Sequence, residues 1–244
     1  MTTIAILSDI HGNKYALDRV INDMSAKKID GLVLLGDLID YGMQSNEIVE
    51  YFLLQNPYPV IVNIWGNHER EIITEEYSGF SSERGEVCAR YTRSILNRSS
   101  IDYLKTKMNS KGKEELVIGG KSILAVHGSL MNPYWKSIFP EELRGDYKQF
   151  DYVLSGHSHI PHWFAKFYPV EDPLYRNKKS VVFINPGSVG QPRNHNPRAQ
   201  YTLLDVDTGA VEMRAVEYDV PAAMDLFKDK PVDSFYGERL ERGV

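Results

Sequence analysis

The sequence contains one cysteine, Cys88, among its 244 residues. A single cysteine cannot form an internal disulfide, so a secreted module held together by disulfides is excluded and a reducing compartment fits best. No apolar run approaches the roughly 18 residues that cross a bilayer. The N-terminus has neither the basic segment nor the cleavage site of a signal peptide. We therefore predict a cytoplasmic protein that has no membrane partner.

An excess of positive charge is also absent, because 28 Lys and Arg stand against 33 Asp and Glu, a net charge of −5. Proteins that bind long nucleic acid usually present a basic face, so we do not expect that partner. An acidic protein can still bind a phosphorylated small molecule if it first binds metal ions, which invert the local field. There is no repeat and no Pro/Gly-rich linker. We predict one domain over residues 1–244, and the sequence leaves an oligomer open.

Short apolar runs alternate with amphipathic stretches along most of the chain. Runs of about four apolar residues without polar alternation are typical of strands buried on both faces. Stripes at Ala16–Met24 and Ile48–Leu53 predict helices between such strands. This alternation favours an α/β fold. A helical insertion is expected over about residues 70–112, and residues 201–218 read as a hairpin that suggests a second, partly antiparallel sheet.

A polar cluster follows each of five apolar runs. Ligands bind at the carboxyl ends of strands in α/β sheets, so five separate loops are expected to converge. Alone, an Asp-x-His or a Gly-Asp means little; the specific feature is the complete ordered series. The clusters are Asp9-x-His11, Gly36-Asp37-x-x-Asp40, Gly66-Asn67-His68-Glu69, His127-Gly128 and Gly156-His157-x-His159.

The side chains of these clusters are of the types that bind metal. Asp, Asn and His suit Mn²⁺, Fe or Zn²⁺ better than the all-oxygen cage of Ca²⁺. The clusters offer seven such ligands with one carboxylate to share, which is the number expected for two ions about 3.5–4 Å apart. The predicted ligands are Asp9, His11, Asp37, Asn67, His127, His157 and His159.

This series resembles the motifs of the calcineurin-like metallophosphoesterase superfamily, namely D-x-H, G-D-x-x-D, G-N-H-[ED], H and G-H-x-H. The turn Asn185-Pro186-Gly187-Ser188 resembles the small bacterial and archaeal members. The resemblance implies an α/β fold of two packed mixed sheets flanked by helices, a four-layer α-β-β-α sandwich. It also implies a dinuclear metal site.

The resemblance assigns a role to each motif residue. Asp9, His11, Asp37 and His159 would hold one ion, and Asp37, Asn67, His127 and His157 the other. His68 would protonate the leaving group, and Asp40 would orient His68. The ions would generate a bridging hydroxide that attacks phosphorus in line. Mn²⁺ is the metal we expect first, with Fe or Zn²⁺ as alternatives.

Departures from the resemblance bear on the substrate. Tyr41 and Trp65 stand where phosphoprotein phosphatases of the superfamily have arginines that grip phosphate. Arg193 is a candidate substitute, although a solvated loop arginine is an equal alternative. Asn13 is a second candidate substrate-binding residue. Tyr134 and Trp135 either stack on a base or, as we favour, pack within the protein.

Several functions remain open from the sequence. The first is hydrolysis of a small phosphodiester or nucleotide, such as a dinucleoside polyphosphate. The alternatives are a phosphomonoesterase or protein phosphatase, and a non-catalytic scaffold that uses the same fold for binding. The scaffold is disfavoured because His68 and all predicted ligands are present. A mononuclear hydrolase or iron oxidoreductase would leave Asp37 and Asn67 without a role.

Overall fold

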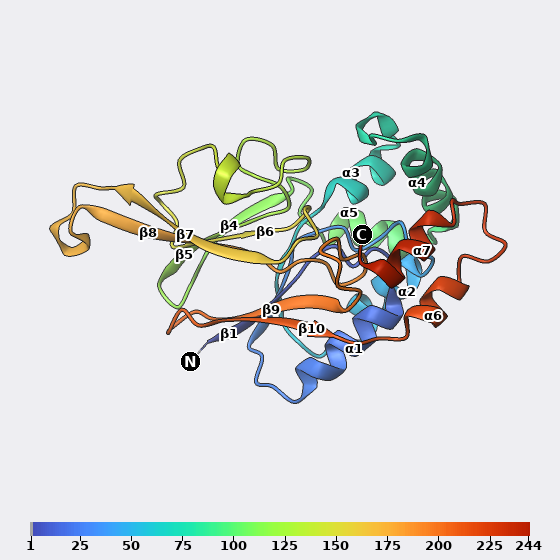
Figure 1. Ribbon diagram of the computed structural model, residues 1–244, viewed down its shortest axis with the longest axis horizontal. Coiled ribbons are helices and arrows are strands. Elements are labelled where there is room, and N and C mark those ends of the chain that lie inside the picture. The colour runs from blue at the N-terminus through green and yellow to red at the C-terminus, as the bar shows by residue number, and fades with distance from the viewer. Residues whose placement is uncertain (1) are drawn as a thin grey trace.

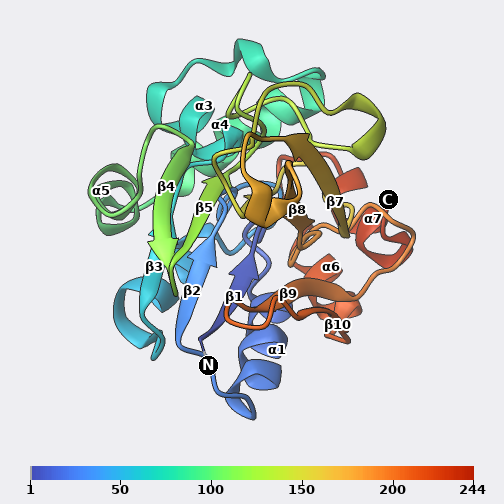
Figure 2. The same cartoon turned by 90° about the vertical axis from the view of Figure 1, so that its left-hand side faces the viewer.

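The computed structural model describes residues 2–244, which fold into two mixed five-stranded sheets packed face to face (Figures 1 and 2). The first sheet has the order β10-β9-β1-β2-β3. In it β1 pairs in parallel with β2 and antiparallel with β9. Its strands are β1 (Thr3–Leu7), β2 (Gly31–Leu34), β3 (Val60–Asn63), β9 (Ala199–Asp205) and β10 (Val211–Val216).

The second sheet has the order β4-β5-β6-β8-β7. Its three inner strands β5, β6 and β8 are parallel, and the edge strands β4 and β7 are antiparallel to their neighbours. The β7–β8 hairpin projects beyond the rest of the molecule (Figure 1). The strands are β4 (Lys113–Ile118), β5 (Lys121–Val126), β6 (Tyr152–Ser155), β7 (His162–Pro169) and β8 (Lys178–Asn185).

The helices gather at one end of the molecule (Figure 1). Asn13 begins the first helix by accepting a hydrogen bond from the Ala16 N–H. The helices are α1 (Lys14–Ser25), α2 (Ser45–Glu50), α3 (Asn67–Thr74), α4 (Glu83–Ile95), α5 (Arg98–Thr106), α6 (Val220–Asp225) and α7 (Phe235–Arg242).

The two faces of the first sheet bury different cores. Ile4 and Ile6 of β1 point toward the second sheet, where they pack in one cluster with Ile123 of β5. Ala5 and Leu7 point the other way and pack in a cluster that includes Leu17 and other residues of α1. The alternation follows from the twofold periodicity of a strand. It explains why these runs carry no polar position.

The predicted two mixed sheets flanked by helices are confirmed. The two outer layers differ, because helices cover the first sheet whereas an irregular segment covers the outer face of the second sheet. Tyr147 and Phe150 of that segment cover Val153 and Phe183. Its regular structure is limited to one short 3₁₀ turn, Pro140–Glu142.

One detail differs from the sequence analysis, and a second adds to it. The hairpin of β9 and β10 extends the first sheet through β1, and does not build a second one. The helical stretch around residues 70–112 is broken at Leu96, after which Asn97 begins α5 by accepting the Ser100 N–H. The single domain over residues 1–244 stays a prediction.

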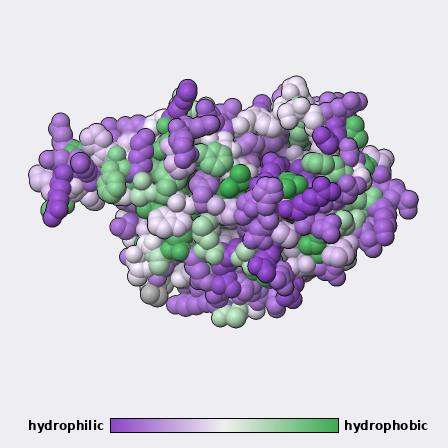
Figure 3. Space-filling model, in the orientation of Figure 1, coloured by the Kyte–Doolittle hydropathy of each residue, from purple (hydrophilic) through white to green (hydrophobic). Residues whose placement is uncertain are grey.

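The described residues show no helix that could span a bilayer. The face drawn in Figure 3 is largely hydrophilic, with hydrophobic residues in small separate patches.

Gly190 allows the loop after β8 to lie directly on the loop after β1. Its N–H donates to Asp9 O at 3.0 Å. A Cβ atom at this position would lie 1.8 Å from Ile10 O. Any side chain at position 190 would therefore push the loop after β8 away from the loop after β1, which carries Asp9 and His11.

We expect Gly190→Ala to destabilise the fold by about 3 kcal/mol, because main chain must move to accept the methyl group. The control is Gly120→Ala, where a Cβ would meet no atom within 4 Å although φ is +76°. That change should cost only about 1 kcal/mol. Urea unfolding of both variants measures the difference, and equal costs would contradict the role of close approach.

Candidate active site

Five strand ends deliver the predicted ligands to one place between the two sheets. Asp9 follows β1, Asp37 follows β2, and Asn67 follows β3 at the start of α3. His127 follows β5 and His157 follows β6 in the second sheet. Several of the residues at these turns have left-handed backbone with φ between 47° and 66°: Asp9, His11, Asp37, His157 and His159. Such backbone strain is concentrated at functional sites.

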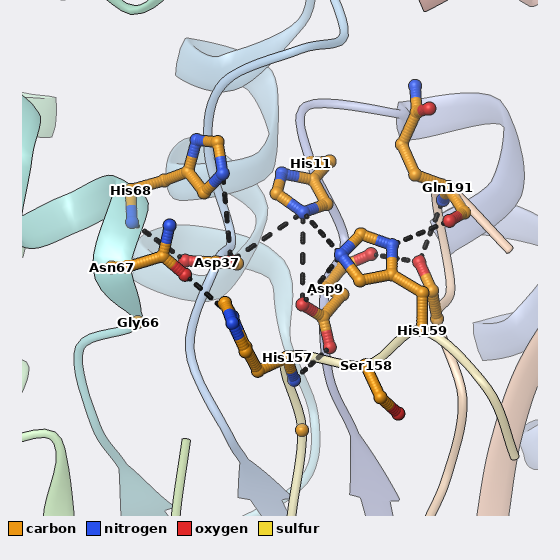
Figure 4. Close-up of polar contacts among 12 residues, drawn as sticks. Asp9, His11, Asp37, Gly66, Asn67, His68, His157, Ser158, His159 and Gln191 are labelled. Carbon is orange, nitrogen blue, oxygen red and sulfur yellow. Dashed lines mark hydrogen bonds and ion pairs between the residues drawn. The ribbon is translucent and has the colours of Figure 1, made fainter. Parts of the chain in front are cut away.

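The first group of donor atoms comprises Asp9, His11, Asp37 and His159, all buried (Figure 4). His159 Nε2 lies 3.1 Å from Asp9 Oδ1, and His11 Nε2 lies 3.6 Å from Asp37 Oδ2. The two histidine Nε2 atoms face each other at 3.3 Å. Their ligand atoms all lie within 4.8 Å of one another.

The second group shares Asp37 with the first and adds His127 and His157. His127 Nε2 lies 3.3 Å from Asp37 Oδ2. Asn67 Oδ1 lies 3.0 Å from both His127 Nε2 and His157 Nδ1. All seven residues predicted as ligands are therefore in one cluster.

The histidine hydrogen bonds show that these donors fit a cation. The Nδ1 atoms of His11, His127 and His159 lie 3.2, 2.7 and 2.6 Å from backbone carbonyls, to which only an Nδ1–H can donate. Each Nε2 of a neutral ring then presents a lone pair to the cluster. Asp9 Oδ1 and Asp37 Oδ2 are buried there without a hydrogen bond. Lone pairs facing one another are stabilised when a metal ion lies among them.

The charges of the cluster are strongly coupled. Burial alone would raise the pKa of Asp37, but His127 and His68 outweigh it and hold the pKa well below its usual value. Burial lowers the pKa of His127, and Asp37 more than reverses this, to about 9. Burial and the charge of His127 lower the pKa of His157 to about 3. Asp37 and His127 therefore each favour the charged form of the other.

His68 and Asp40 form a hydrogen-bonded pair beside the ligands. His68 Nδ1 donates to Asp40 Oδ2 at 2.6 Å, and His68 Nε2 lies 4.0 Å from Asp37 Oδ2. Thr92 of α4 donates its hydroxyl to the other Asp40 oxygen at 2.7 Å. Burial lowers the pKa of His68, but Asp37 and Asp40 outweigh it and raise the pKa above its ordinary value.

Two neighbours of this pair were not expected from the sequence. Thr92 lies in the helical insertion and belongs to no motif. Cys88, which is remote from every motif in the sequence, places its Sγ 3.8 Å from Tyr41 O. Burial raises the pKa of its thiol far above the ordinary value, so the thiol stays protonated and packs as an apolar group.

Glu69 is the buried residue that fixes the metal-binding loops. Its carboxylate accepts the backbone N–H groups of Asp37, Leu38 and Gly66 at 2.7–2.8 Å, and that of Ile39 at 3.3 Å. It thereby ties the loop after β2 to the start of α3. The Gly-Asn-His-Glu motif contains Glu69 and its partner Gly66, but the partners Asp37, Leu38 and Ile39 lie 30–32 residues away in the chain.

The Asn185–Ser188 turn ties the remaining loops together. Asn185 donates its amide N–H groups to Gly156 O at 2.8 Å and Ser158 Oγ at 3.0 Å. Ser188 donates its hydroxyl to Asp9 O at 2.7 Å. The turn therefore bridges the loops that follow β1 and β6.

The remaining candidate residues fall into two groups. Arg193 is partly buried. The pKa of His159 is lowered to about 4, first by burial and second by the charge of Arg193. Trp135 lies 6.1 Å, ring to ring, from His157. By contrast, the Asn13 side chain accepts a hydrogen bond from the Ala16 N–H and donates one to Gly190 O. The Tyr134 hydroxyl donates to Ser110 O. Arg193 and Trp135 thus lie at the cluster, whereas the other two have partners in the fold.

Buried paired carboxylates and imidazoles at strand ends, with a histidine–aspartate pair beside them, define a metal-dependent hydrolase site. The chain matches the model of the calcineurin-like phosphoesterase superfamily domain over residues 2–209. It therefore belongs to that superfamily, and it is a metal-dependent phosphoesterase.

The chain is similar to proteins from an archaeon and two bacteria. It is 30% identical over 244 residues to the uncharacterized protein MJ0912 of Methanocaldococcus jannaschii, covering 98% of each chain. It is 24% identical to the phosphodiesterase YfcE of Escherichia coli K12, covering 86% of this chain and 91% of that protein. A metallophosphoesterase structure from Sphaerobacter thermophilus superposes with a TM-score of 0.76 at 26% identity, over 100% of this chain and 99% of that one.

We expect Glu69→Gln to lower Mn²⁺ affinity by about 10–100-fold, as losses of supporting hydrogen bonds to metal sites do. The amide NH₂ of glutamine would face backbone N–H groups that need an acceptor. Calorimetric titration of metal-stripped protein measures the affinity. The matched control is Glu75→Gln on the surface. Unchanged Mn²⁺ binding by the Glu69 variant would rule out this positioning role.

Proposed function

We propose that the protein is a dinuclear phosphoesterase that hydrolyses a small phosphodiester or nucleotide. Asp9, His11, Asp37 and His159 would hold one divalent ion, and Asp37, Asn67, His127 and His157 would hold the other. The observation that carries this proposal is the arrangement of donor atoms in two groups that share Asp37. Mn²⁺ is the ion we favour, because mixed carboxylate and imidazole donors suit it.

When bound, the ions supply activation of the attacking water and neutralise charge on the phosphoryl oxygens. His68 then donates its Nε2 proton to the leaving oxygen. Asp40 accepts the hydrogen bond from His68 Nδ1 and stabilises the protonated ring, and Thr92 fixes Asp40 in turn. Burial of the cluster excludes bulk water from the donor atoms.

The rings of Phe80 and Trp135 form an aromatic wall beside the cluster, and this wall favours a substrate with a small organic leaving group. Phe80 lies 5.1 Å, ring to ring, from His68, and Trp135 lies 6.1 Å from both Phe80 and His157. A nucleobase or other flat group can stack against such rings. The relative named phosphodiesterase YfcE also favours a diester. Arg193 is the residue we assign to the phosphate, since guanidinium suits its oxygens.

The two positions at which the superfamily's phosphoprotein phosphatases have arginines are occupied here by side chains that pack within the protein. Trp65 is buried and donates its indole N–H to Leu104 O at 2.7 Å, so that position serves packing. Tyr41 packs between the rings of His68 and Tyr236. A protein phosphatase is therefore the weaker alternative. The cytoplasmic location stays a prediction.

Metal-stripped protein should hydrolyse no phosphate ester, and reloading with Mn²⁺ should restore turnover. We expect bis(p-nitrophenyl) phosphate and diadenosine tetraphosphate to be hydrolysed with at least about tenfold higher kcat/KM than p-nitrophenyl phosphate. Two bound ions per chain, counted by metal analysis, should accompany full activity. Preference for the monoester would reject the substrate class, and no turnover with two ions bound would support the scaffold alternative.

His68→Ala should lower kcat on a diester with an alkoxide leaving group, such as a 2′,3′-cyclic nucleotide, on the order of 10²–10⁴-fold. The loss should be smaller on bis(p-nitrophenyl) phosphate, because p-nitrophenolate leaves without a proton whereas an alkoxide needs one. Equal losses on both substrates would contradict the role of His68 as an acid. Metal analysis of the variant serves as the control for ligand loss.

Asp40→Asn should shift the alkaline limb of kcat to lower pH by about 1 pH unit. Asp40 raises the pKa of His68, and the acid form of His68 is present only below that pKa. Without Asp40 the active form is lost earlier as the pH rises. The pH profile of kcat measures the shift, and an unmoved limb would contradict the pairing.

A further inference from the structure

Helix α7 brings a buried arginine to the edge of the site. Arg239 is 8% exposed, and its Cζ lies 4.9 Å from the centroid of the Tyr41 ring. That ring in turn lies 4.4 Å from the ring of His68 and 4.6 Å from that of His11. The match to the superfamily ends at residue 209. Arg239 is thus a site neighbour supplied from outside the matched segment.

Arg239 has a second arginine close by, because its Nε donates to Gln191 and Arg193 follows Gln191 by two residues. Burial, followed by the charge of Arg193, lowers the pKa of Arg239 to about 10, which leaves Arg239 charged at neutral pH. Across residues 2–244, neither guanidinium forms an ion pair. Arg214, by contrast, lies 2.6 Å from Asp23. Two neighbouring cations, one of them buried, are costly in a protein unless an anion offsets them.

Both guanidinium groups hold unused donors. Arg239 Nη2 and Arg193 Nε are buried without a hydrogen-bond acceptor. Arg239 is held in place by its Nε, which donates to Gln191 Oε1 at 2.6 Å. Gln191 O accepts from His159 Nδ1, and the Arg193 backbone N–H donates to His159 O at 3.2 Å (Figure 4 shows Gln191 beside His159). Both arginines are thus tied to the loop of one predicted metal ligand.

We propose that Arg193 and Arg239 form a subsite for a second phosphoryl group, adjacent to the one that is hydrolysed. Guanidinium groups bind phosphate oxygens through charge-assisted hydrogen bonds. Arg193 contacts the His159 loop through its backbone and Arg239 lies over the Tyr41 ring, whereas the aromatic wall of Phe80 and Trp135 adjoins His68 and His157. This inference rests on the proposed function and narrows its substrate to a phosphate chain, such as a dinucleoside polyphosphate.

A purely structural role for Arg239 makes a different prediction. Its bond to Gln191 supports His159, so loss of that support would lower turnover on every substrate alike. A subsite for a second phosphoryl group affects only substrates that carry one. Substrates with one and with several phosphorus atoms therefore separate the two roles.

The first test compares Mn²⁺-loaded wild type with Arg239→Met, Arg193→Met and Arg239→Lys. We expect each Met variant to raise KM for diadenosine tetraphosphate at least about tenfold. KM for bis(p-nitrophenyl) phosphate should change less than about twofold, and Arg239→Lys should recover part of the loss because it restores the charge. Arg242→Met, an exposed position on the same helix, is the matched control. Equal effects on both substrates, or none, would overturn the proposal.

The second test needs no turnover. Metal-free wild type should bind inorganic tripolyphosphate in calorimetry, and Arg239→Met and Arg193→Met should each weaken that binding by at least about tenfold. Circular dichroism checks that the variants are folded. Unchanged tripolyphosphate affinity in the variants would overturn the subsite even if the enzyme is active. If tripolyphosphate binds as expected but no ester is hydrolysed, the proposed function fails and the subsite stands.

Discussion

The buried carboxylate of Asp37 serves two groups of imidazoles at once, and the site is built around its fixed position. Asp37 Oδ1 accepts a hydrogen bond from the backbone N–H of His68 at 2.9 Å, and Oδ2 is directed at His127 and His11. Glu69 holds the Asp37 backbone from the opposite side. Because these hydrogen bonds hold the Asp37 carboxylate in one orientation, it can bridge two cations without reorganising, as preorganised metal sites require.

Burying these charged and polar groups together costs free energy in the metal-free protein, and the same arrangement favours the binding of a cation. Burial opposes the charged form of each carboxylate and imidazole, and only their mutual attraction keeps Asp37 ionised. The left-handed backbone at Asp9, Asp37 and His157 adds strain. A cation among these donors relieves the repulsion between lone pairs. Metal binding should therefore be coupled to the stability of the loops.

The sequence predicted those parts of the molecule that are encoded locally. Buried strands, and the polar residues immediately after them, appear as contiguous segments, so the seven residues predicted as ligands could be named from the sequence, and they lie together in one cluster. The β4 and β7 strands were missed because each alternates exposed and partly buried residues at a sheet edge. Thr92, Cys88 and Arg239 reach the site through helix packing. No local pattern marks such a contact, since it depends on the relative placement of α3, α4 and α7.

The proposed subsite separates the predicted chemistry of the site from its selectivity. The metal donors, His68 and Asp40 all lie within the segment that matches the superfamily, on loops anchored by two sheets. Arg239 lies beyond that segment, on a helix that packs through Tyr236 and Leu240 against Cys88 of α4. The helix reaches the donor atoms through intermediate residues, because Arg239 lies over the Tyr41 ring and donates to Gln191, whose backbone O accepts from His159 Nδ1. In the proposed subsite, a charge from outside the matched segment therefore adds a contact for a second phosphoryl group to donor atoms that the matched segment supplies.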